Sequence, residues 1–181
     1  IKMLVRLEEL LAEAKGKSYA LGAFNIENLE TTLGVVQAAV AKKSPVILQV
    51  SETSIRYAGL KAITAIVQAV ASAESGDIPI ALHLDHGKTF RSVAECIRAG
   101  FSSIQMDASE MPLMENIILT KQAVDFAHRK NVLVQAELGV VKGLEEMSKE
   151  EKEKYMTDPD EAEEFVAKTG VDTLAVAVGN V

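Results

Sequence analysis

Six short apolar segments alternate with amphipathic helical segments along almost the whole chain, and this alternation limits the fold more than any other feature. The expected strands are residues 19–25, 45–50, 79–87, 103–106, 132–136 and 173–178. The expected helices are residues 4–16, 28–43, 60–75, 91–99, 114–130 and 160–168. Continuous apolar strands between helices are typical of a parallel sheet covered by helices.

Serial βα units can form either a doubly wound sheet or a (β/α)8 barrel. No Gly-x-Gly-x-x-Gly motif follows the first expected strand, and this disfavours a dinucleotide-binding doubly wound fold. We therefore predict an α/β chain with a single domain over residues 1–181, a TIM (β/α)8 barrel truncated to about six βα units.

Composition excludes several classes of function. Apolar residues make up 48% of the chain, as in a globular protein, and a formal net charge of −7 argues against a nucleic-acid-binding surface. No apolar run resembles a signal peptide or a membrane span, so we expect no membrane partner. The single cysteine, Cys96, cannot form an internal disulfide and is expected in the core, which favours a cytoplasmic location.

Polar side chains end most of the expected strands. They are Asn25, Ser51, Asp85 with His86, Asp107 with Ser109, Glu137, and Asn180. Such residues also begin turns and cap helices, but in a barrel the carboxyl ends of all strands meet on one face, where active sites lie. Imidazole and carboxylate groups suit a borderline cation such as zinc, so His86, Asp107 and Glu137 form a candidate partial ligand set.

Strand alternation places His83 and Asp85 on one side of their strand and His86 on the other. A bend at Gly87 would bring Asp85 and His86 to the same rim. We expect His83 to point into the barrel, where it either orients the site or makes a core hydrogen bond, and His128 to lie on the surface. We find no lysine at a strand end, which disfavours a Schiff-base aldolase.

Five of the motifs at strand ends resemble the class II, metal-dependent ketose-bisphosphate aldolases. They are residues 23–25 (AFN), 82–87 (LHLDHG), 106–109 (MDAS), 136–139 (AELG) and 177–181 (AVGNV). The fourth motif is followed by Gly143 and by Glu145-Glu146. The resemblance covers essentially the whole chain, with the motifs in the family's order.

The resemblance implies reversible cleavage of fructose 1,6-bisphosphate into dihydroxyacetone phosphate and glyceraldehyde 3-phosphate, as in glycolysis. It implies that His86 binds the catalytic Zn2+ and that Asp107 and Glu137 can hold a second or displaced metal ion. Another divalent ion, or an additional monovalent cation, is an alternative. It further implies that Asp85 and Glu145 are the catalytic acids. The substrate-binding residues would be Asn25, Ser51, Gly179 and Asn180.

Two departures from the family pattern are evident. In the family, the motif that ends at Val181 is followed by His-Gly, whose histidine binds zinc, and by two further strands. We therefore expect 181 residues alone to bind zinc poorly, to turn over little and to leave two exposed sheet edges. Lys142 stands where many relatives have glycine. Tagatose-bisphosphate aldolase, a catalytically inactive barrel fragment and another metal-dependent barrel enzyme remain alternatives, and we expect the full-length protein to be a homo-oligomer.

Overall fold

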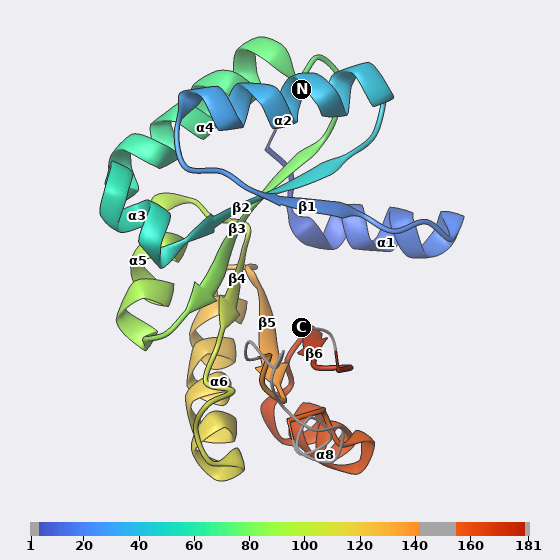
Figure 1. The fold of residues 1–181 in the computed structure, drawn as a ribbon, viewed down its shortest axis with the longest axis vertical. Helices are drawn as coiled ribbons and strands as arrows, with labels where there is room; N and C mark the ends of the chain where they lie inside the picture. The colour runs from blue at the N-terminus through green and yellow to red at the C-terminus, as the bar shows by residue number, and fades with distance from the viewer. Residues whose placement is uncertain (1–3, 142–154, 180–181) are drawn as a thin grey trace.

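The computed structural model describes residues 4–141 and 155–179, and these form a curved parallel sheet with helices around its convex side (Figure 1). The strands are β1 (Gly22–Asn25), β2 (Val46–Ser51), β3 (Ile80–Gly87), β4 (Ser103–Met106), β5 (Leu133–Leu138) and β6 (Thr173–Val176). The helices are α1 (Leu7–Lys17), α2 (Leu29–Lys42), α3 (Glu52–Ala58), α4 (Leu60–Glu74), α5 (Phe90–Ala99), α6 (Leu113–His128) and α8 (Pro159–Thr169).

The sheet order is β1-β2-β3-β4-β5-β6, and every neighbouring pair is parallel. This is the strand order of a barrel, in which each strand pairs with the next along the chain, and the predicted partial (β/α) barrel is confirmed. Since the order begins with β1 and ends with β6, each of these two strands has one neighbour among the described residues. The prediction of two free edges is also confirmed for this part of the chain.

The two faces of the sheet differ in chemistry. Along β2, Val46, Leu48 and Val50 are buried, whereas Ile47, Gln49 and Ser51 between them are partly exposed. Strand β5 alternates in the same way. The buried side chains join the main core beneath the helices on the convex side, and the alternate ones line the concave side. The sheet therefore has an apolar outer face and an inner face that carries polar groups.

Helix α1 differs from the other helices because it packs near the amino-terminal ends of the strands. Leu7 and Leu10 form a small second apolar cluster with Ala81 of β3, and the Val5 N–H donates to the Ile80 carbonyl at 2.9 Å. This cluster covers the end of the concave side opposite to the polar strand ends. Figure 1 shows α1 near β1, at the open side of the curved sheet.

The helix boundaries follow from local capping chemistry. Asn28 caps α2 by accepting from the Thr31 N–H, and the Thr31 hydroxyl accepts from the Asn28 N–H, which makes a capping box. Asp158 caps α8, with Pro159 at its first position, and Gly170 ends it in a left-handed conformation. Helix α3 was not predicted from the sequence.

Candidate metal centre and active site

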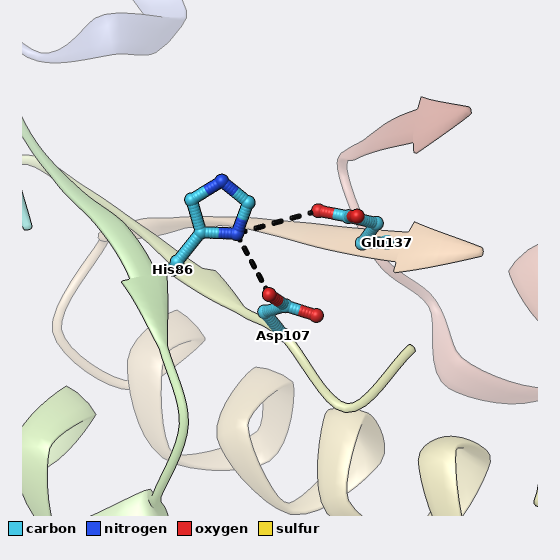
Figure 2. Close-up of side chains that lie close together, drawn as sticks. All are labelled: His86, Asp107 and Glu137. Atoms are coloured by element: carbon cyan, nitrogen blue, oxygen red, sulfur yellow. Dashed lines mark hydrogen bonds and ion pairs between the residues drawn. The ribbon is translucent and has the colours of Figure 1, made fainter. Parts of the chain in front are cut away.

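His86, Asp107 and Glu137 meet at the carboxyl ends of three neighbouring strands (Figure 2). The His86 Nδ1 atom lies 2.7 Å from Asp107 Oδ2 and 3.5 Å from Glu137 Oε2. One ligand atom from each residue lies within 4.8 Å of the other two. The sequence predicted that these three side chains converge, and the structure brings them together.

An irregularity in β3 turns His86 toward this cluster. Leu84 pairs with Ile104 and Gly87 with Met106, so β3 has one residue more than β4 between these pairs, and His86 has φ 52°. A bulge re-aims a side chain in this way. The predicted bend at Gly87 is therefore wrong in its position, because His86 itself adopts the left-handed conformation.

Gly87 is needed for a different reason, which is close packing. A Cβ atom at this position would lie 2.7 Å from the Gln105 carbonyl oxygen and 2.8 Å from Leu84 Cδ2. Only glycine lets the end of β3 approach β4 and the apolar core so closely. The tight pairing after the bulge fixes the direction of the preceding His86 side chain.

Asp107 is the most strongly hydrogen-bonded carboxylate of the cluster. Burial favours its neutral form, but hydrogen bonds from His86, Lys88 and Ser109 outweigh this effect and hold the pKa of Asp107 well below its ordinary value. Ser109 donates both its hydroxyl and its backbone N–H to Oδ1, at 2.7 and 3.2 Å. Asp107 is therefore an anion near neutral pH, as a metal ligand must be.

The same bonds affect the other two members of the cluster. The hydrogen bond to Asp107 raises the pKa of His86 above its ordinary value, against the opposing effect of burial. Burial first, and then repulsion by Asp107, raise the pKa of Glu137. The Gln105 side-chain amide donates to Glu137 Oε2 at 2.7 Å and fixes this carboxylate. The donor set of one imidazole and two carboxylates suits a borderline divalent cation.

Lys88 follows β3 directly, and its Nζ lies 2.5 Å from Asp107 Oδ2. The sequence-based statement that no lysine stands at a strand end is therefore wrong. Its Nζ is bound to the buried Asp107 carboxylate, so Lys88 is not placed as the free amine that a Schiff-base mechanism requires. The sequence already indicated this position, because Lys88 directly follows Gly87 at the end of the expected strand.

Asp85 lies beside the cluster and is oriented by two amides. The Asn25 side chain donates to Oδ2 at 2.7 Å, and the Gln49 side chain donates to Oδ1 at 3.2 Å. Asp85 Oδ1 is 3.9 Å from His86 Nε2. Gln49 was not predicted as a site residue, although its position two residues before Ser51 places both side chains on the inner face of β2.

The other predicted site residues divide into two groups. Ser51 caps α3, since its Oγ accepts from the Ser54 N–H at 3.1 Å, and Gly179 has φ 84°. Glu145 and Asn180, together with Gly143 and Lys142, lie outside the described residues.

A cavity of about 520 Å³ opens over the cluster of His86, Asp107 and Glu137. It is lined by His86, Lys88, Asp107, Ser109, Glu110, Glu137, Val140, Val141, Ala175 and Val176.

His83 lies inside the sheet and makes a core hydrogen bond, one of the two roles predicted for it. Its Nδ1 is 2.8 Å from the Ser103 hydroxyl, and burial lowers its pKa to about 4 although Asp85 opposes this. His128 is on the surface as expected, but it also pairs with Asp172 at 2.9 Å. Cys96 is buried and free, and burial raises its pKa to about 12.

Comparisons with known proteins agree on one family. The model of the family "Fructose-bisphosphate aldolase class-II" matches residues 5–181. The chain is 47% identical over 179 residues to a "Probable fructose-bisphosphate aldolase" of Bacillus subtilis, with 98% of this chain and 62% of that relative covered. A fructose-bisphosphate aldolase of Geobacillus stearothermophilus is 45% identical, with the same coverage.

A solved structure gives the same result. The crystal structure of the YdjI aldolase from Escherichia coli K12 matches with a TM-score of 0.85 and 36% sequence identity, covering 98% of this chain and 63% of that one. The chain thus spans about three fifths of the length of these relatives. Among the described residues no helix is both long and apolar enough to cross a membrane.

The converging strand-end motifs, the partial barrel and the match over residues 5–181 give one assignment. The chain belongs to the class II fructose-bisphosphate aldolase family.

Proposed function

We propose that this protein is a metal-dependent aldolase that reversibly cleaves fructose 1,6-bisphosphate into dihydroxyacetone phosphate and glyceraldehyde 3-phosphate. The observation that carries the proposal is the convergence of His86, Asp107 and Glu137 beside Asp85, in a chain of the class II family. A carbon–carbon lyase needs a proton acceptor next to a centre that stabilises negative charge, and this arrangement provides both.

His86, Asp107 and Glu137 would hold the divalent ion, and zinc is a borderline ion that accepts both nitrogen and oxygen ligands. When bound, the ion would act as a Lewis acid and stabilise the charge that develops on the substrate oxygens. We propose zinc as the metal that this protein binds.

Asp85 would take the proton of the C4 hydroxyl during cleavage. As that proton leaves, the C4 oxygen forms the aldehyde carbonyl, the C3–C4 bond breaks and its electron pair remains on the dihydroxyacetone phosphate half. In condensation Asp85 returns the proton. The amides of Asn25 and Gln49 hold its two oxygens, so little orientation has to be gained during the reaction.

The remaining roles follow the family resemblance. Glu145 would move the proton at C3 of dihydroxyacetone phosphate, and Asn25, Ser51, Gly179 and Asn180 would contact the substrate. We further propose a cytoplasmic protein, a single barrel domain and a homo-oligomer. Tagatose bisphosphate, which differs in the configuration at C4, is the alternative substrate, and a side-by-side assay of both sugars separates the two.

The test is a coupled assay of fructose 1,6-bisphosphate cleavage, using the protein as its gene encodes it. We expect Asp85→Asn to lower kcat by about 10²–10⁴-fold, since one positioned acid–base group contributes about this much, while the zinc content stays unchanged. Asp125→Asn, in an exposed pair with Lys121, is the matched control and should retain full activity. Removal of metal by a chelator should abolish cleavage, and zinc should restore it.

Two outcomes would contradict the proposal. Cleavage that survives complete metal removal would exclude the metal-dependent mechanism. A zinc-loaded protein that cleaves neither sugar would favour the non-catalytic alternative.

A further inference from the structure

The acceptor positions of Asp107 are all in use without any metal. An ionised carboxylate offers about four lone-pair positions, two on each oxygen. Oδ1 accepts two bonds from Ser109, and Oδ2 accepts one from His86 at 2.7 Å and one from Lys88 at 2.5 Å. A cation that binds through Asp107 must therefore displace at least one existing donor.

Lys88 is the donor that can leave most easily. Ser109 is two residues from Asp107, so its two bonds belong to a local turn. The His86 bond is lost once His86 Nδ1 binds the ion, and the Lys88 ammonium would then share Oδ2 with that ion. Lys88 ends in a flexible chain that is 49% exposed, whereas the Asp107 side chain is 2% exposed. Its ammonium can return to water, where it recovers full hydration, while Asp107 cannot.

We propose that Lys88 is a tethered cation that occupies part of the metal centre and competes with the divalent ion for Asp107. In the metal-free state the ammonium compensates the two buried carboxylates, and on metal binding it moves away from Oδ2. Lys88 would thereby weaken metal affinity while keeping the empty centre stable. The inference rests on the metal-binding part of the proposed function and is independent of the sugar substrate.

The first test measures zinc affinity of the metal-stripped protein, as encoded by its gene, by competition with a chromogenic chelator. Lys88→Met removes the charge and keeps most of the length of the side chain, and we expect its Kd for zinc to be roughly tenfold lower than that of the wild type. A charge-assisted hydrogen bond whose cation is partly exposed to solvent is expected to change the affinity by about this factor. Lys88→Arg, which keeps the charge, should remain near the wild-type Kd.

Lys121→Met is the matched control, since Lys121 is also an exposed lysine paired with an acid, Asp125, but it lies on α6 away from the centre. Its Kd should equal that of the wild type. An unchanged or weaker affinity in Lys88→Met would overturn the inference, whereas the aldolase proposal would stand if zinc-dependent cleavage persists. Failure of all variants to bind zinc would overturn both.

A second measurement uses the wild type alone and does not depend on how the variants fold. Reductive methylation, followed by mass spectrometry, reports the accessibility of each lysine amine. We expect Lys88 to be modified slowly in the metal-free protein and several-fold faster with stoichiometric zinc, while the rate at Lys121 stays constant. Equal rates at Lys88 with and without bound zinc would show that the ammonium does not leave, which would overturn the inference.

Discussion

The buried imidazole of His83 makes the fold sensitive to acid, and the size of the effect can be calculated. Burial lowers its pKa from 6.5 to about 4, so below pH 6.5 the unfolded chain binds a proton that the folded chain does not. The contribution of His83 to stability is therefore full above pH 6.5, falls as the pH drops, and levels off near pH 4. Each pKa unit corresponds to about 1.4 kcal/mol, which gives about 3 kcal/mol over this interval.

The perturbation that isolates this effect is His83→Asn. Asparagine can still form a hydrogen bond with the Ser103 hydroxyl from near the position of Nδ1, but it does not titrate in this range. Free energies of unfolding from urea titrations at pH 4–8 should fall by about 3 kcal/mol more in the wild type than in the variant. The comparison between variants cancels the contributions of Asp107 and Glu137, which titrate in both proteins.

Parallel profiles for the wild type and His83→Asn would refute the reasoning, since they would mean that the buried imidazole binds its proton equally well in the folded and unfolded chains.

Two further results are expected. Gly87→Ala should lower the free energy of unfolding by about 1–3 kcal/mol in urea titrations, because its Cβ would overlap the Gln105 carbonyl oxygen; Gly34→Ala, with open space around its Cβ in α2, should raise it by about 0.4–1 kcal/mol, and equal effects would contradict the packing argument. The Cys96 thiol, buried and with its pKa raised to about 12, should not react with a thiol reagent at pH 8 in the native protein but should react fully in urea, and rapid native labelling would show that the core opens there.

Sequence patterns predicted the strand order and most element boundaries to within a few residues. They missed α3, because Glu52–Ala58 is a single short helix whose cap, Ser51, is also the last residue of β2. The strands were expected to be continuous apolar segments, and in the structure the burial of β2 and β5 alternates from residue to residue. The alternation arises because the helices cover the convex face, whereas the concave face is partly open.

The sequence by itself determined which groups can bind a cation, because a parallel strand order sends the residues that follow each strand to one edge of the sheet. It therefore predicted that His86, Asp107 and Glu137 would meet. The tertiary structure decided how they meet. The bulge turns His86 toward the cluster, the Gln49 amide orients Asp85, and the Lys88 ammonium forms an ion pair with Asp107. These contacts join residues 19–36 positions apart in the sequence, and they depend on strand register and close packing, which no local pattern records.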